Sequence, residues 1–188
     1  AFLADPEFVA KASGGRRKSI NTCIACNQTC LDRSFARSAR ESQIVSCLVN
    51  PWACHETEMQ KKREPASPGA IAIVGAGPAG LAAAVVLAER GCRVTLFESG
   101  AEIGGQFRMA KRVPSKTEYS ETLRYFSSRI EELNIDLRLR ASPTPELLKQ
   151  YSHVFLATGA RPRELTLGPT DERVFSFRRT ENHFSFED

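Results

Sequence analysis

The chain has 188 residues, of which 41% are hydrophobic and 26% charged, and its formal net charge is +4. This composition suits one globular domain or one and a half small ones. Both signs of charge are scattered and the short basic clusters lack neighbouring aromatic residues, so we expect no nucleic-acid partner. The opening residues lack a secretory signal, and the six cysteines therefore indicate a cytoplasmic or other reducing compartment rather than a disulfide scaffold.

The N-terminal part is predicted to begin with a short helix and to continue into a cysteine-rich segment. Asp5 followed by Pro6 is typical of a helix N-cap, and Gly14 predicts the end of that helix. Residues 21–62 then carry five of the six cysteines. The proline, serine and glycine of "REPASPGA" predict a linker over residues 63–69.

Residues 70–88 form a run of 19 residues without a charge, which is long enough to span a membrane. Turn-forming residues interrupt this run at Gly75, Gly77, Pro78 and Gly80. The part before them is β-branched and the part after them is rich in alanine, so the pattern predicts strand, tight turn and helix. We therefore expect no membrane span.

Strands and helices are predicted to alternate from residue 70 onward, which indicates an α/β fold with a parallel sheet. The last stretch, residues 178–188, does not continue this pattern and is read as an atypical or truncated tail. The predicted elements are a strand over 70–74, a helix over 79–90, a strand over 92–98, a long helix over 116–133, a strand over 135–140, a short capped helix over 144–151 and a buried strand over 153–159.

The sequence "GAGPAG", residues 75–80, has the glycine spacing of a dinucleotide-binding loop between a strand and a helix. Gly75 is expected to make the tight turn, Gly77 to admit a pyrophosphate, and Gly80 to let helix and strand pack closely. Glu98 ends the next strand, where a carboxylate accepts hydrogen bonds from a ribose and repels a 2′-phosphate, so FAD or NAD is favoured over NADP. The alternative is a glycine-rich turn without a ligand and a surface glutamate.

The sequence "CIACNQTC", residues 23–30, places three cysteines within eight residues, and a fourth candidate follows at Cys47 or Cys54. Three close thiolates and one distant thiolate suit an iron–sulfur cluster better than zinc, which usually takes two separated pairs. The alternatives are a zinc site or ordinary buried thiols. Cys92 begins a strand and is interpreted as a core residue.

Together these motifs resemble the NADPH-dependent 2,4-dienoyl-CoA reductases, relatives of trimethylamine dehydrogenase and the old yellow enzymes. The resemblance rests on "NTCIACNQTCLD", "SCLVNPWACHETE", "IVGAGPAGLAAAVVLAERGCRVTLFE", "EIGGQF" and "ETLRYF". It implies a [4Fe-4S] cluster held by Cys23, Cys26, Cys30 and Cys47. The motif "SCLVNP" favours Cys47 over Cys54 as the fourth ligand. It implies an FAD site on Gly75, Gly77, Pro78, Ala79, Gly80, Glu98, Gly105, Gln106, Thr158 and Gly159. The preference for FAD over NAD comes from "IGGQF" and "ATGARP", a combination that resembles the two-dinucleotide-domain flavoprotein disulfide reductases and their relatives.

The resemblance also implies a domain order and a direction of electron flow. It divides the chain into the end of an FMN barrel (1–20), an iron–sulfur segment (21–62), the linker (63–69), an incomplete Rossmann-type FAD-binding domain (70–177) and the tail (178–188). In such enzymes NADPH reduces FAD, the cluster passes single electrons to FMN, and FMN reduces an enoyl-CoA. The FMN and NADPH sites are expected to lie largely outside this chain, and no catalytic acid or base is assigned within it.

Three features depart from the pattern of that family. Ala25 replaces a usual glycine, Trp52 stands where a basic residue is common, and the interval between Cys30 and Cys47 is longer. The alternative functions are those of an amine dehydrogenase, another enone reductase, or a non-catalytic remnant that binds FAD or NAD. The fragment alone is expected to be inactive toward a dienoyl-CoA.

Overall fold

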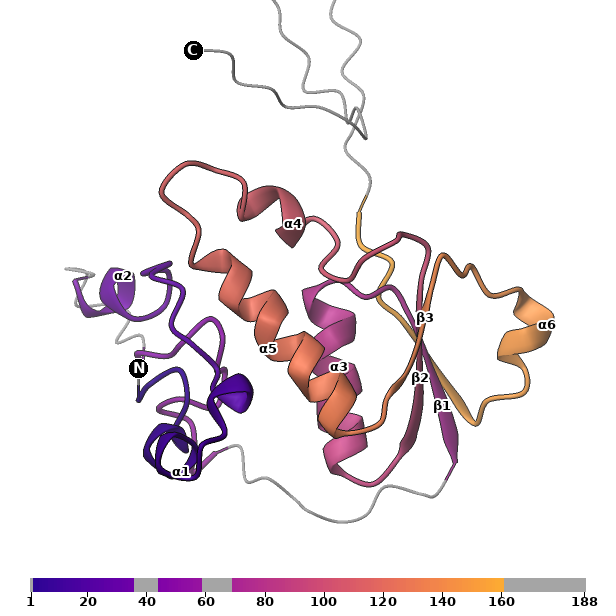
Figure 1. Ribbon diagram of the computed structural model, residues 1–188, viewed down its shortest axis with the longest axis horizontal. Helices are drawn as coiled ribbons and strands as arrows, with labels where there is room; N and C mark the ends of the chain where they lie inside the picture. Colours follow the sequence, from indigo (N-terminus) through magenta and orange to yellow (C-terminus); the bar gives the residue numbers. More distant parts are fainter. Residues whose placement is uncertain (1, 36–43, 59–68, 161–188) are drawn as a thin grey trace, which may run out of the picture.

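The computed structural model describes residues 2–35, 44–58 and 69–160 (Figure 1). Its centre is a four-stranded sheet in the order β3-β2-β1-β4, and every neighbouring pair is parallel. The predicted α/β class with a parallel sheet is therefore confirmed. The strands are β1 (Ala70–Val74), β2 (Arg93–Glu98), β3 (Asp136–Leu139) and β4 (His153–Leu156).

Two long helices, α3 (Pro78–Glu89) and α5 (Tyr119–Glu132), lie on one side of the sheet (Figure 1). Helix α3 follows β1 directly, starts at a proline that suits the first helical position, and packs on β1 and β2. Helix α5 buries Leu123 and Ile130, which lie on one helical face, and packs on α3. Both helices agree with the predicted ones to within a few residues at each end.

The core lies between the two central strands and these helices. Ile73, Leu81, Leu96 and Phe97 are the largest fully buried side chains. All five residues of β1 are apolar and the four middle residues of β2 are buried, as expected for central strands with both neighbours and both faces covered. Burial of each such side chain contributes about 1.5–3 kcal/mol. The core therefore holds in place the loops that leave the carboxyl ends of β1 and β2.

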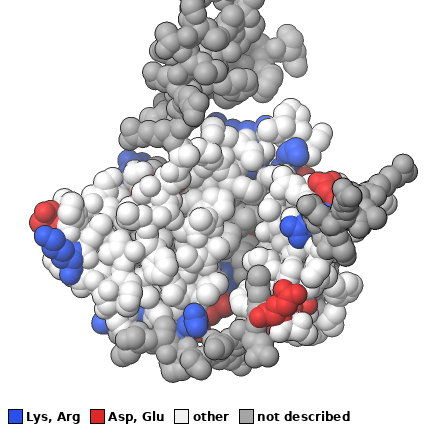
Figure 2. Space-filling model, turned by 180° about the vertical axis from the view of Figure 1, so that it is seen from behind, with Lys and Arg blue, Asp and Glu red and all other residues white. Residues whose placement is uncertain are grey.

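Strand β4 differs from the predicted buried strand over 153–159. It ends at Leu156, and all four of its residues are exposed, with Leu156 at 74%. The reason is its position, because β4 lies at the edge of the described sheet and pairs with β1 alone. Seen from behind, the molecule shows a broad surface with few charged side chains (Figure 2). The apolar sequence of β4 predicted burial, but β4 is exposed because it lies at the edge of the described sheet.

The short elements include three that the sequence did not predict. Helix α6 (Pro145–Leu148) confirms the short capped helix, because the Leu147 N–H donates to Thr144 Oγ1 at 3.3 Å. Helix α4 (Phe107–Ala110), the 3-10 turn η1 (Arg17–Ser19) and helix α2 (Leu31–Ser34) were not expected. None of the three exceeds four residues, which is too short for a periodic sequence pattern to show.

The N-terminal part packs beside α5, and a buried carboxylate holds its beginning together. Helix α1 (Phe8–Ser13) starts three residues after Asp5, which was predicted to be its N-cap. Asp5 is instead 2% exposed, pairs with Lys11 Nζ at 2.8 Å and accepts the Asn21 N–H at 2.8 Å. It also accepts the Glu7 N–H at 3.0 Å. Asp5 thus ties the first helix to the start of the cysteine segment.

Four sequence predictions fall wholly or partly outside the described residues. These are residues 36–43 and 59–62 of the iron–sulfur segment, most of the linker at 63–69, the part of the FAD-binding domain after residue 160, and the tail at 178–188. The division of the chain into domains consequently stays a prediction. Among the described helices, none combines the length and the hydropathy needed to cross a membrane.

Candidate functional site

The glycine loop of residues 75–80 leaves the carboxyl end of β1 and opens α3. Gly75 has a φ of +106°, in the region that favours glycine, and its N–H donates to the Phe97 carbonyl at 2.7 Å. A Cβ on Gly75 would overlap the carbonyl oxygen of Ala157, and a Cβ on Gly80 would overlap that of Gly75. Two of the three motif glycines are therefore required by close backbone packing, whether or not a ligand is present.

Gly77 differs from the other two glycines because it faces open space. A Cβ there would meet no atom within 4 Å, and its φ of −73° is open to any residue. Gly77 is also the N-cap of α3, a helix of 12 residues whose first N–H groups lack partners within the helix. The N-terminus of a helix attracts anions through these N–H groups and the helix dipole. The open space at Gly77 is thus suited to a phosphate group.

A second glycine pair lies across from this loop. The Gly104 N–H donates to the Ala76 carbonyl at 2.7 Å, and a Cβ on Gly105 would lie 3.1 Å from Gly77 Cα. Gln106 follows, and its Nε2 donates to the Ala160 carbonyl at 3.0 Å. The structure therefore brings the predicted residues Gly105 and Gln106 to the glycine loop, from a segment about thirty residues later in the chain.

Glu98, at the end of β2, contacts the glycine loop itself. Its Oε2 accepts the Ala76 N–H at 2.8 Å, and its Oε1 accepts the Gly100 N–H at 2.7 Å. Ser99 Oγ also donates to Oε1 at 3.3 Å, whereas Oε2 can accept a further hydrogen bond, so recognition of a ribose hydroxyl is still open to Oε2. The sequence predicted the ribose role alone, and the structure adds a role in holding the loop in place.

The end of β4 completes the edge of this site. Thr158 Cα lies 3.2 Å from the position of a Cβ on Gly75, and Gly159 has a φ of +73°. All ten predicted dinucleotide-binding residues thus come from segments that follow β1, β2 and β4 at the carboxyl edge of the sheet. Because the chain runs from β1 to β2 and β3 on one side and places β4 on the other, this edge contains the switch point at which α/β sheets bind ligands.

Three described hydrogen bonds join the halves of the cysteine segment. The Ser46 N–H donates to the Thr29 carbonyl at 3.0 Å, Asn21 Nδ2 donates to the Val49 carbonyl at 2.7 Å, and Arg33 Nη1 donates to the Ile44 carbonyl at 2.8 Å. The first half turns sharply, because Ala25 and Asn27 have φ values of +51° and +59°. The stretch that holds Cys23, Cys26 and Cys30 is thereby joined to the stretch that holds Cys47.

Cys47 lies in the second half of this segment and is half-buried, as Cys26 is in the first half, whereas Cys23 is exposed. Burial raises the pKa of the Cys47 thiol, the backbone N–H groups of Val49 and Asn50 oppose that rise, and the charges of Cys23 and Cys26 add to it. Cys30 immediately precedes α2 and is half-buried, whereas Cys54 is exposed. Cys92 is buried and packs in the core, which confirms its interpretation.

The described residues contain no group of three histidine, cysteine, aspartate or glutamate side chains that could hold a single metal ion. The cysteine ligand set therefore stays a prediction. Two buried polar atoms in the same segment, Asn21 Oδ1 and Thr29 Oγ1, have no hydrogen-bond partner among the described residues. Thr29 precedes Cys30, so its hydroxyl is a donor available beside a predicted ligand.

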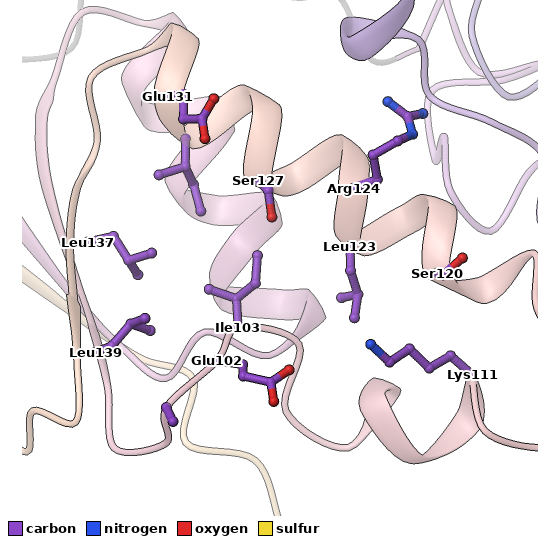
Figure 3. Close-up of a pocket in the computed structure, with 12 residues that line it drawn as sticks. Glu102, Ile103, Lys111, Ser120, Leu123, Arg124, Ser127, Glu131, Leu137 and Leu139 are labelled. Atoms are coloured by element: carbon purple, nitrogen blue, oxygen red, sulfur yellow. The ribbon is translucent and has the colours of Figure 1, made fainter.

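A cavity of about 560 Å³ lies between α5, β3 and the segment that follows β2 (Figure 3). Ile103, Leu123 and Leu137 give it an apolar lining, and Lys111 and Glu102 stand at its edge. Nothing in the sequence indicated this cavity, because its lining comes from three segments without a shared motif. It contains none of the ten predicted dinucleotide-binding residues.

Comparisons with known proteins agree with this geometry. A family profile described as an NAD(P)-binding Rossmann-like domain matches residues 73–133. A metal reductase of Desulforamulus reducens is 35% identical over 168 residues, which are 86% of this chain and 24% of that protein. Other relatives are named as a cinnamate reductase, an alkene reductase and a dimethylamine dehydrogenase.

Solved structures of similar sequence have the same fold over most of the chain. A 2-naphthoyl-CoA reductase in complex with 2-naphthoyl-CoA is 32% identical with a TM-score of 0.82, covering 88% of this chain and 25% of that one. A histamine dehydrogenase from Rhizobium sp. 4-9 is 28% identical with a TM-score of 0.75, covering 87% of this chain and 25% of that one. The chain thus spans about a quarter of the length of these relatives.

Proposed function

Because the chain is homologous to a segment of the flavin-dependent reductases and amine dehydrogenases related to old yellow enzyme, we propose that it is the electron-relay portion of such an oxidoreductase. We place FAD on the glycine loop and a [4Fe-4S] cluster on the four cysteines Cys23, Cys26, Cys30 and Cys47. In the complete protein we propose the electron order NADPH, FAD, [4Fe-4S], FMN.

The observation that carries this proposal is that hydrogen bonds join the stretch of Cys23, Cys26 and Cys30 to the stretch that holds Cys47, in a segment packed against a Rossmann-like domain. Each thiolate of a [4Fe-4S] cluster binds a different iron, so its ligands are spread more widely than those of one ion. The backbone N–H groups of Val49 and Asn50 oppose the rise in the pKa of Cys47, and N–H donors to ligand sulfurs are a recurrent means of tuning such clusters.

The residues at the carboxyl edge of the sheet fit a dinucleotide. The space at Gly77 and the free N–H groups at the start of α3 would hold a pyrophosphate, and Glu98 would accept a ribose hydroxyl. When bound, FAD supplies acceptance of a hydride and an iron–sulfur cluster supplies one-electron transfer. The task of this chain is then to hold the two groups at fixed places on one rigid unit.

For the complete protein we propose reduction of an activated carbon–carbon double bond in a coenzyme A thioester. The similarity to a 2-naphthoyl-CoA reductase supports a thioester substrate, and the similarity to a cinnamate reductase supports a conjugated double bond. The specific form of the proposal is a 2,4-dienoyl-CoA reductase of fatty-acid β-oxidation. The chain spans about a quarter of those relatives, and we propose that the substrate site lies outside the part it matches.

Cysteine variants test the metal part of the proposal, with iron per chain measured after anaerobic purification. Cys26→Ser should lose the cluster and keep FAD. Cys47→Ser should also lose iron, whereas Cys54→Ser, at an exposed cysteine, is the matched control and should keep it. Iron retained in Cys47→Ser and lost in Cys54→Ser would show that the fourth ligand is Cys54. Full iron in Cys26→Ser would reject the ligand set.

Amine oxidation is the second candidate function, and the similarity to histamine dehydrogenase and dimethylamine dehydrogenase favours it. The two candidates differ in the direction of electron flow, because an amine gives electrons to the flavins and an enoyl thioester takes them. Anaerobic mixing of the complete, oxidised protein with each substrate class separates them. Bleaching of the flavin absorbance by amines supports dehydrogenation, and reoxidation of the reduced protein by an enoyl-CoA supports reduction.

A further inference from the structure

Arg124 on α5 joins the dinucleotide-binding domain to the cysteine segment. Its Nη1 donates to the Lys18 carbonyl at 2.6 Å, and its Nη2 donates to the Ile20 carbonyl at 2.8 Å and to Thr22 Oγ1 at 3.3 Å. The guanidinium group thus contacts three alternate residues of one stretch of chain. That stretch ends immediately before Cys23.

A carboxylate on the same helix fixes the direction of the guanidinium group. Arg124 Nε donates to Glu121 Oε2 at 2.7 Å, and Glu121 lies one helical turn before it. The same Glu121 oxygen lies 3.4 Å from Thr22 Oγ1. Figure 3 shows Arg124 directed away from the apolar lining of the cavity and toward the N-terminal segment. Both side chains of this pair are therefore used to grip the residues before Cys23.

Arg124 contacts the chain closer to Cys23 than Glu132 of α5 does. Glu132, near the end of α5, bonds Ser19, and Asp5 accepts the Asn21 N–H from within the N-terminal part itself. Of the described hydrogen bonds from α5, those of Arg124 and Glu121 extend furthest toward the cysteines. A planar fork with several donors can satisfy separated acceptors at once, which a lysine ammonium group cannot do in the same geometry.

We propose that Arg124 is a positioning residue that fixes Cys23 relative to the dinucleotide-binding domain, and thereby fixes the iron–sulfur site relative to the flavin site. Residues that orient metal ligands from outside the ligand set govern the affinity and properties of the site. The guanidinium group also donates to Thr22, the residue before the proposed ligand Cys23, and nearby positive charge stabilises the reduced form of a cluster. The part of this inference that concerns the cluster rests on the proposed function.

The test uses Arg124→Gln, Arg124→Lys and the control Arg138→Gln in the same chain. Arg138 is an exposed arginine on β3 that pairs with Asp136 and makes no hydrogen bond to the N-terminal part. Hydrogen exchange of peptides covering residues 16–26 is compared with that of peptides covering β1. This measurement needs no cofactor, so it tests whether Arg124 holds residues 16–26 in place even if no cluster is bound.

Both Arg124 variants should raise exchange in residues 16–26 about tenfold or more, since charge-assisted hydrogen bonds are lost, and leave β1 unchanged. Arg138→Gln should match the wild type in both regions. Wild-type exchange at 16–26 in Arg124→Gln, or an equal rise in β1, would overturn the proposal. Wild-type exchange in Arg124→Lys would also overturn it, because a positive charge alone would then hold residues 16–26 without the several donors of the guanidinium group.

The second measurement is the reduction potential of the cluster, followed by its electron paramagnetic resonance signal in dithionite titrations of the iron-loaded chain. Arg124→Gln should shift the potential to more negative values, and Arg138→Gln should leave it unchanged. An unchanged potential in Arg124→Gln would refute the role toward the cluster. Failure of the wild-type chain to bind iron would refute the proposed function instead, and hydrogen exchange would still decide whether Arg124 holds residues 18–22.

Discussion

Two of the loop glycines, Gly77 and Gly80, should respond in opposite ways to the same added methyl group. At Gly80 the new Cβ would overlap the carbonyl oxygen of Gly75 and lie 3.1 Å from its carbonyl carbon and 3.3 Å from Ala157 Cβ. Two of these three atoms belong to the backbone at the end of β1. Strand and helix would have to separate, because no flexible side chain can give way.

The expected cost of Gly80→Ala is at the upper end of the range for overpacking, about 3 kcal/mol. For a chain of this length, that corresponds to a fall in melting temperature of roughly 6–12 °C. Gly77→Ala should cost almost nothing. Its Cβ meets no atom within 4 Å, and the poorer N-cap is offset by the lower entropy of the unfolded chain.

Gly80→Ala should lower stability more than Gly77→Ala does, whereas Gly77→Ala should weaken the binding of FAD. The methyl group at Gly77 occupies the space proposed for the pyrophosphate, so Gly77→Ala should fold normally and lose FAD affinity. Thermal unfolding by circular dichroism gives the stability, and quenching of flavin fluorescence on titration gives the affinity. A wild-type melting temperature for Gly80→Ala would refute the packing argument, and wild-type FAD affinity for Gly77→Ala would refute the position of the pyrophosphate.

Three further variants test other parts of the structure. Ala25→Gly should stabilise the cysteine segment by up to about 1 kcal/mol in denaturant unfolding, because Ala25 has a φ of +51°; a loss of stability would contradict the left-handed turn. Asp5→Asn should cost about 3 kcal/mol by the same assay, because it leaves the ammonium group of Lys11 without its buried partner; a change near zero would argue against that ion pair. Burial raises the pKa of Glu132, but hydrogen bonds from Ser19 and Arg129 outweigh it and hold that pKa below its usual value. Its stabilising effect is thus present at neutral pH and lost in acid, so Glu132→Gln should lower stability at pH 7 and flatten its decline below pH 4.5; parallel pH curves for variant and wild type would rule this out.

The central fold followed from the sequence because its signals are local. The change from a β-branched run to an alanine-rich run around "GAGPAG" predicted β1 and α3 to within one residue at each end. The long helix predicted over 116–133 corresponds to α5 (Tyr119–Glu132) in the same way. These elements bury enough apolar surface that local preference and tertiary packing agree.

The sequence could not predict features that depend on long-range partners. The exposure of β4 depends on its place at the edge of the sheet, and the burial of Asp5 depends on Lys11 and Asn21 lying beside it. The contact of Glu98 with Ala76 needs two strands to be side by side before it exists. The grip of Arg124 on residues 18–22 spans more than a hundred positions, and no motif marks it.

Ala25 is an instructive case between these two groups. Its replacement of a usual glycine was visible as a departure from the family pattern, and the structure gives Ala25 the positive φ that favours glycine. The local geometry of the turn is thus kept while the residue type has changed. The sequence alone shows that Ala25 departs from the family pattern, and the positive φ of Ala25 explains why a glycine is expected there.

The most direct test of the electron-relay proposal is the visible spectrum of the chain purified without oxygen, with iron, zinc and flavin quantified on the same sample. The account predicts about four irons per chain, a broad charge-transfer absorbance and bound FAD together in one preparation. Zinc in place of iron, or a chain that binds neither metal nor flavin under these conditions, would contradict it.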